Sequence, residues 1–394
     1  MKKRYLFCLW VALLAVVSSC VYDYDPQIDG EGGYMIVEGD IIIGDMSSIS
    51  LSYSWTLVDT LDTAEERMRL LYGTQMHVED SNGGRYENQS ATVSGAPYGL
   101  FDMRTADPSL EYRLVIKNNK GTYASAWGKA TTGGQIDSLS YRITEDRTTM
   151  EIMVSTHSSD PQGGYYRWSV NETWEYHAMT DALYKYVILA PGQGEVVELQ
   201  NDEHTYRCWS SGRRPEIMTG TTVELKEDRL VDHVLYTLNY HDERISALYC
   251  PEVLQMRIPK DAYRYWEVMN RNSSDVGGLF SPEPSELRGN VVNLDHPDEL
   301  VLGYVGVMSV IRSKFYIDNS FIQFYRRGEQ LRPVIDTLNN PYDYWLAYHT
   351  GKRPAYDVFN DTTGDWVGYE WWPVSCVDCR TKGGTVTKPA DWPY

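Results

Sequence analysis

Four cysteines carry the clearest choice of chemistry in this chain: Cys208, Cys250, Cys376 and Cys379. In an oxidising compartment, an even number of cysteines predicts structural disulfides, here two, with three possible pairings. The CxxC spacing of Cys376 and Cys379 also occurs in zinc sites and in redox pairs. A zinc site would need a second CxxC or a pair of histidines, and neither follows. We therefore expect disulfides and no metal.

Aromatic side chains suited to holding a ligand or a partner crowd the tail of the chain after Pro341. The candidates for such a contact surface are Trp345, Trp366, Tyr369, Trp371 and Trp372. Exposed tryptophan and tyrosine stack on sugar faces and anchor protein interfaces. The same side chains would lose that role if the tail packed them against the sheets. The sequence leaves both possibilities open.

The sequence lacks the motifs of common enzyme classes. Its eight histidines include no HExxH pair, and His204, His233 and His241 lack the spacing of metal ligands. There is no GxSxG sequence, and no glycine-rich stretch carries a phosphate-binding lysine. The sequence NDTTGD at Asn360–Asp365 departs from the spacing of a calcium loop, so it predicts a polar turn. We expect a protein that is not an enzyme and that needs no cofactor.

Glu172 is a separate candidate, because it lies between Trp168 and Trp174 in the sequence YYRWSVNETWEY. In a strand, side chains two residues apart share a face, which places Glu172 among aromatic side chains. A carboxylate in such surroundings is either an acid with a raised pKa or the partner of an arginine. We expect the second role, with Arg167 or Arg207 as the partner.

The N-terminus predicts export and lipid attachment. Lys2 to Arg4 are basic, and residues 5–17 are apolar but shorter than the about 20 residues that span a bilayer. The sequence VSSC at Val17–Cys20 resembles a bacterial lipobox. This resemblance implies that residues 1–19 are a signal peptide and that Cys20 becomes the fatty-acylated first residue, carrying palmitate-type chains that hold the protein at a membrane.

The residues after Cys20 predict where the protein faces. Residues 20–33 are rich in acidic residues and glycine, which predicts a flexible acidic tether. Acidic residues at this place resemble the signal that moves lipoproteins of the Bacteroidota to the cell surface. We expect a lipid-anchored outer-membrane protein that faces the cell exterior. The formal net charge of −19 disfavours a nucleic-acid partner, because phosphates would be repelled.

The elements that must position these residues are mainly β. The 31 tyrosines favour pleated, half-buried surfaces. Residues 34–132 predict a β-sandwich, whose clearest part is an alternating strand that ends in a turn at Asn118–Gly121. Residues 135–394 predict a larger β-rich α+β domain with one amphipathic helix at Asp261–Arg271, and the aromatic tail should wrap back over it, fastened by the CxxC. The segment Thr63–Gly73 predicts a short helix or an acidic loop.

Three stretches resemble a family of Bacteroidota outer-membrane lipoproteins, domain of unknown function 4249 (DUF4249). They are YYRWSVNETWEY at Tyr165–Tyr176, AYRYWEVMNRNSSDVGGLFSPEPSELRGNVVN at Ala262–Asn293 and CVDCRTKGGTVTKPADW at Cys376–Trp392. The resemblance covers nearly the whole mature chain. It implies that the N-terminal sandwich is Ig-like, similar to the regulatory domains that accompany carboxypeptidases. The family has no established catalytic residues, so none is carried over.

The resemblance also implies a role. Members are often encoded beside a TonB-dependent transporter, so we expect a non-enzymatic accessory or ligand-capture partner of such a β-barrel transporter at the cell surface. An independent carbohydrate- or peptide-binding surface module is the alternative, and a hydrolase is the third possibility.

Overall fold

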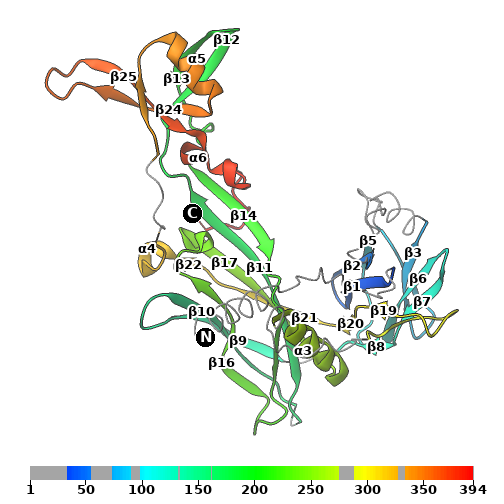
Figure 1. Cartoon of the computed structure of the whole chain (residues 1–394). Helices are drawn as coiled ribbons and strands as arrows, with labels where there is room; N and C mark the ends of the chain where they lie inside the picture. The colour runs from blue at the N-terminus through cyan, green and yellow to red at the C-terminus, as the bar shows by residue number, and fades with distance from the viewer. Residues whose placement is uncertain are drawn as a thin grey trace, which may run out of the picture.

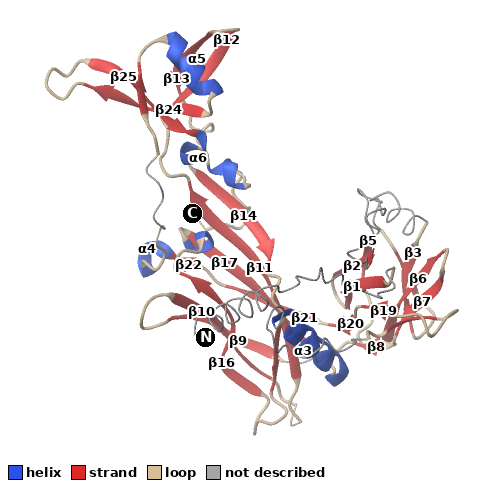
Figure 2. Cartoon of the chain, in the orientation of Figure 1, coloured by secondary structure: helices blue, strands red, loops and turns tan. Residues whose placement is uncertain are grey.

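The computed structural model describes residues 33–54, 73–89, 98–131, 134–160, 162–274, 288–326 and 333–393. The predicted signal peptide, Cys20, the tether as far as residue 32 and residues 63–72 of the predicted helix or loop lie outside these ranges. No helix within the described ranges is long and apolar enough to cross a membrane. Strands dominate the structure (Figure 2), so the prediction of a mainly β protein is confirmed.

The first body is a β-sandwich, at the right of Figure 1. Alternation along each strand directs one set of side chains inward, and in β6 these are Tyr112, Leu114 and Ile116. One sheet contains β1 (Met35–Ile42), β2 (Met46–Tyr53) and β5 (Tyr98–Asp102). The other contains β3 (Gln75–Asp80), β4 (Arg85–Glu87), β6 (Glu111–Asn118), β7 (Gly121–Ser125) and β8 (Gly128–Lys129). The β6–β7 turn lies where the sequence predicts it.

Three strands from much later in the chain complete this sandwich. They are β18 (Val291–Asn293), β19 (Val301–Leu302) and β20 (Val305–Met308). β19 and β20 run parallel to β1, and β18 pairs with β7. The sequence pattern places these residues in the second domain, so the predicted boundaries miss this return. An alternating pattern predicts a strand but does not determine which other strand it pairs with, and here the paired strands are far apart in sequence.

Gly303, between β19 and β20, permits the close approach of this returning segment to β1. Its φ is +100°, and an added Cβ would lie 1.9 Å from the carbonyl oxygen of Val37. Only glycine adopts this conformation without strain, and only glycine leaves room for the neighbouring strand.

The central body contains two sheets that pack on one core (Figure 1). Its largest buried side chains are Trp168, Tyr166 and Tyr249. The smaller sheet has the order β16-β10-β9, with β9 (Gln135–Ile143), β10 (Thr149–His157) and β16 (Arg229–Asn239). The larger has the order β14-β11-β17-β21, with β15 and β22 at its margins: β11 (Tyr165–His177), β14 (Arg207–Arg213), β15 (Met218–Thr221), β17 (Leu248–Ile258), β21 (Val310–Lys314) and β22 (Ile317–Asp318).

Helix α3 (Lys260–Ser274) lies where the sequence predicts an amphipathic helix. Its apolar side chains Ala262, Tyr265 and Trp266 pack in a cluster with Tyr304 and Met308 of the segment that returns to the sandwich. The helix therefore contributes to the junction between the sandwich and the central body. Two short helical segments lie elsewhere in the central body, η1 (Glu243–Ile245) and α4 (Asn319–Ile322).

A third body, the distal lobe, lies at the top of Figure 1. It is built around Trp371, Tyr344 and Tyr186, which come from segments far apart in sequence. Its elements are β12 (Tyr184–Ala190), β13 (Gln193–Glu198), β23 (Asp336–Leu338), α5 (Pro341–His349), β24 (Lys352–Phe359) and β25 (Trp366–Pro373).

The distal lobe corrects the prediction that the whole tail wraps over the body. Residues 336–373 instead pack with the β12–β13 hairpin, because Tyr186 of that hairpin covers Trp371. The final segment returns to the central body: α6 (Val374–Val377) still packs against β24 and β25, and η2 (Cys379–Lys382) contacts β14.

Candidate functional site

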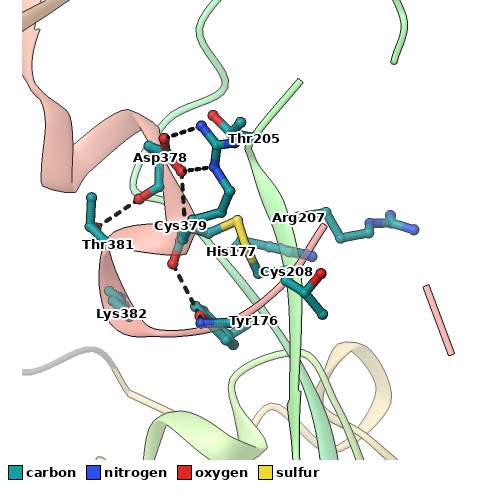
Figure 3. Close-up of a disulfide and its surroundings, with 12 residues drawn as sticks. Tyr176, His177, Thr205, Arg207, Cys208, Asp378, Cys379, Thr381 and Lys382 are labelled. Atoms are coloured by element: carbon teal, nitrogen blue, oxygen red, sulfur yellow. Dashed lines mark hydrogen bonds and ion pairs between the residues drawn. A yellow bond between two sulfur atoms is a disulfide. The ribbon is translucent and has the colours of Figure 1, made fainter. Parts of the chain in front are cut away.

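One disulfide joins the returning tail to the central sheet (Figure 3). It links Cys379 in η2 to Cys208 in β14, with their Cα atoms 5.8 Å apart. Cys250 and Cys376 are free thiols, and Cys250 is buried. The expectation of two disulfides is therefore wrong for this structure. The CxxC does fasten the tail, but through Cys379 alone.

Hydrogen bonds around the disulfide hold the tail in place (Figure 3). The Tyr176 hydroxyl donates to the Cys379 carbonyl at 3.0 Å, and the Cys379 amide donates to the Thr205 carbonyl at 2.9 Å. Further along, the Trp392 indole donates to Glu175 at 2.9 Å in a buried contact. Burial alone would raise the pKa of Glu175, but the hydrogen bonds from His177 and Trp392 outweigh it and lower that pKa. The region around Cys376 and Cys379 therefore has a structural role, because it attaches the tail to the central body.

The five predicted contact aromatics divide between the interior and the surface of the distal lobe. Trp371 is fully buried and stacks on Tyr344, with ring centroids 5.5 Å apart. It belongs to the core of the lobe, so its predicted role in contact is wrong. Trp345, Tyr369 and Trp372 are half-buried, whereas Trp366 is 45% exposed. Trp366 remains the one clear surface aromatic among the five.

Other elements of the distal lobe expose apolar side chains that are not among the five predicted contact residues. With Trp366 they form what we term the distal apolar set: Ile188, Leu189, Tyr342, Leu346, Phe359, Trp366 and Val367. These side chains belong to strand β12, to helix α5 and to the two strands of the β24–β25 hairpin. The apolar sequence YVILA, which is followed directly by a turn that contains glycine, is the sequence signal that could have indicated the β12–β13 hairpin.

Glu172 is buried and binds two arginines. It accepts from Arg214 and from Arg244, each at 2.8 Å, and from the hydroxyl of Tyr249. The predicted structural role is therefore correct, but both predicted partners are wrong. Arg167 pairs with Asp40 instead, because it faces the opposite side of β11. Arg207 pairs with Glu175 at 3.2 Å.

The surroundings of Glu172 favour a structural role for this residue over a catalytic one. Burial raises the pKa of Tyr249 and of Tyr236, so both phenols stay protonated and can donate hydrogen bonds. The Tyr236 and Tyr249 hydroxyls lie 2.8 Å apart. Two guanidinium groups donate hydrogen bonds to the Glu172 carboxylate, as expected of a structural ion pair.

The remaining candidates also have local structural partners. His204 lies 3.0 Å from Asp181, and His241 lies 2.6 Å from the Arg326 carbonyl. His233 packs on Trp168, and burial lowers its pKa. The side chain of Asn360 accepts backbone hydrogen bonds within its own turn, as expected of a polar turn. Within the described ranges, no group of three or more acidic, histidine or cysteine side chains is arranged to hold a metal.

A groove of about 720 Å³ lies between the sandwich and the central body. Its walls come from β1 and β2 on one side and from β11, β14, β17 and α3 on the other. The buried ion pair of Asp40 and Arg167 crosses this junction. Arg167 also lies over the Trp266 ring, 4.5 Å from its centroid. No local sequence signal marks the groove, because its walls belong to separate bodies.

Two comparisons with known proteins bear on this chain. A comparison with curated proteins finds no match. The model of the family described as "Domain of unknown function (DUF4249)" matches residues 21–314, which include the sandwich, α3 and nearly all of the central body. The resemblance found in the sequence is thereby confirmed, and the chain belongs to the DUF4249 family.

Proposed function

We propose that this protein is a surface-exposed outer-membrane lipoprotein that acts as a non-enzymatic accessory of a TonB-dependent transporter. The acylated Cys20 would anchor it, and the acidic tether would let its body reach a neighbouring membrane protein. The distal lobe would dock on the extracellular loops of the transporter barrel.

The observation that carries this proposal is the exposure of the distal apolar set. Leu189 is 63% exposed and Tyr342 is 69% exposed, and such side chains gain free energy when a partner covers them. Aromatic residues among them are the types that dominate protein interfaces. The β24–β25 hairpin extends outward from the lobe (Figure 1), which suits insertion between loops.

The alternative role is an independent carbohydrate-binding module that uses Trp366. The exposed Trp366 ring favours it, but the Trp366 indole already donates to Asp357 at 2.9 Å, and the other tryptophans of the set expected from the sequence are half-buried or buried. A single exposed ring offers little stacking surface for an oligosaccharide.

Affinity purification from native membranes in mild detergent tests the docking. The triple variant Leu189→Ser, Phe359→Ser and Trp366→Ser should recover at least about tenfold less β-barrel protein than the natural chain, since interface anchors each contribute about 1–2 kcal/mol. Phe321→Ser is the matched control, because Phe321 is an exposed aromatic on α4, outside the lobe. Recovery of the lipoprotein alone, or equal recovery of the barrel by the triple variant, would refute the proposal.

A further inference from the structure

The groove between the sandwich and the central body presents two charged side chains that form no ion pair and no side-chain hydrogen bond among the described residues. Glu38 is exposed on β1, on the sandwich wall. Arg213 is exposed at the end of β14, on the central-body wall. Among the residues that the structure describes, the groove therefore has one anion and one cation without an ion-pair partner, and each belongs to a different body.

The other charges that line the groove neutralise one another. Asp40 pairs with Arg167, and Glu216 pairs with Arg214. Arg214 is buried, and although its terminal nitrogens bind carboxylates, its Nε has no hydrogen-bond partner in the described structure. A ligand thus meets a groove that is balanced in charge overall but carries opposite charges on its two walls.

The surfaces between these charges suit side chains of moderate size. Trp266, Met46, Ile217 and Leu254 supply apolar area, and Ser48 supplies a hydroxyl group. The groove volume of about 720 Å³ falls in the range of small-ligand sites. A strongly anionic ligand would meet Glu38, Asp40 and Glu216, and a neutral sugar would leave both free charges without partners.

We propose that this groove binds a short peptide with free termini. The peptide ammonium group pairs with Glu38, its carboxylate pairs with Arg213, and its side chains lie on Trp266 and the neighbouring apolar residues. Arginine suits the carboxylate end because its planar guanidinium can bind both carboxylate oxygens. This inference rests on the proposed accessory role, because the bound peptide would be the nutrient that the protein captures for the transporter.

Calorimetric titration of the purified mature chain tests the proposal without a transporter, so its result is separate from that of the docking experiment. The probes are a series from dialanine to pentaalanine, the N-acetylated and the C-amidated forms of the best binder, and maltotetraose. Removing one terminal charge should weaken binding by about tenfold, the usual effect of losing a charge-assisted hydrogen bond. Maltotetraose should not bind measurably.

Two variants assign each terminus to its partner. Glu38→Gln should weaken binding of the free peptide, and N-acetylation of the peptide should then weaken binding no further. Arg213→Gln should also weaken binding of the free peptide, and C-amidation should then have no further effect. Arg142→Gln, an exposed arginine on β9, is the control and should bind as the natural chain does. Both mutated groove side chains are exposed, so the variants should fold, which circular dichroism checks. Equal binding of capped and free peptides, or binding of maltotetraose in their place, would overturn the proposal.

Discussion

Glu172 illustrates how one buried residue organises the central body. Its carboxylate joins Arg214 and Arg244, which come from different parts of the chain, and it also accepts from Tyr249. Burying an ion pair costs solvation, but removing one member costs more, because the charges left behind have no compensation. The residue therefore favours one arrangement of these segments over alternatives.

We predict that Glu172→Gln lowers the free energy of unfolding by roughly 2 kcal/mol, since the buried side chain loses charge-assisted hydrogen bonds to Arg214 and Arg244, which keep only Glu216 and Asp242 as acidic partners. Urea denaturation followed by tryptophan fluorescence measures the change. Glu224→Gln, at an exposed position, should change the free energy by less than about 0.5 kcal/mol. Equal stability of the two variants would show that Glu172 is dispensable.

At the scale of elements, the disulfide determines where the end of the tail lies. Cys379 in η2 and Cys208 in β14 are separated by 171 residues, and the bond closes a loop that includes β23, α5, β24 and β25 of the distal lobe, whereas the β12–β13 hairpin precedes the loop. Cross-linking so long a loop restricts the unfolded chain, which is one accepted source of disulfide stabilisation. Cys376 lies close in sequence but takes no part.

The double variant Cys208→Ala and Cys379→Ala should lose about 2–4 kcal/mol of stability. Its tail after residue 374 should also be cleaved faster in limited proteolysis. The matched control is Cys376→Ser, which leaves the disulfide intact and should behave as the natural chain does. A Cys376→Ser variant that loses the disulfide, as judged by peptide mass mapping without reduction, would contradict the pairing.

At the scale of the whole molecule, two ion pairs between described residues cross from the sandwich to the central body. Asp40 and Arg167 form a buried pair, and Asp40 also accepts from the Gly306 amide at 3.2 Å. Asp45 and Arg312 form an exposed pair at 2.5 Å. The two pairs span the same junction but differ in burial, so they offer a matched comparison.

Asp40→Asn should increase hydrogen exchange in β20 and in α3 by about 100-fold, the equivalent of roughly 3 kcal/mol, because Arg167 would stay buried without its partner. Asp45→Asn should change exchange there by less than about fivefold, since exposed pairs contribute at most about 1 kcal/mol. Mass spectrometry of exchanged peptides measures both. Similar exchange in the two variants would mean that the buried pair does not hold the junction.

The sequence by itself determined the local features of this protein. The alternation in Glu111–Asn118 and the turn after it predicted the β6–β7 hairpin, and apolar spacing predicted α3. The buried pairing of Glu172 with arginine was also predictable. The hairpin and the helix depend on side chains within a few residues of one another, so period and turn chemistry are enough to identify them, whereas for Glu172 only the kind of partner followed from its aromatic surroundings.

Only the tertiary structure decided which distant segments meet. It paired β19 and β20 with β1, chose Arg214 and Arg244 for Glu172, joined Cys208 to Cys379 and buried Trp371 beneath the β12–β13 hairpin. It also placed Glu38 and Arg213 on the two walls of one groove. These outcomes depend on the free energy of packing and strand pairing over the whole chain, and no short pattern encodes the identity of a partner hundreds of residues away.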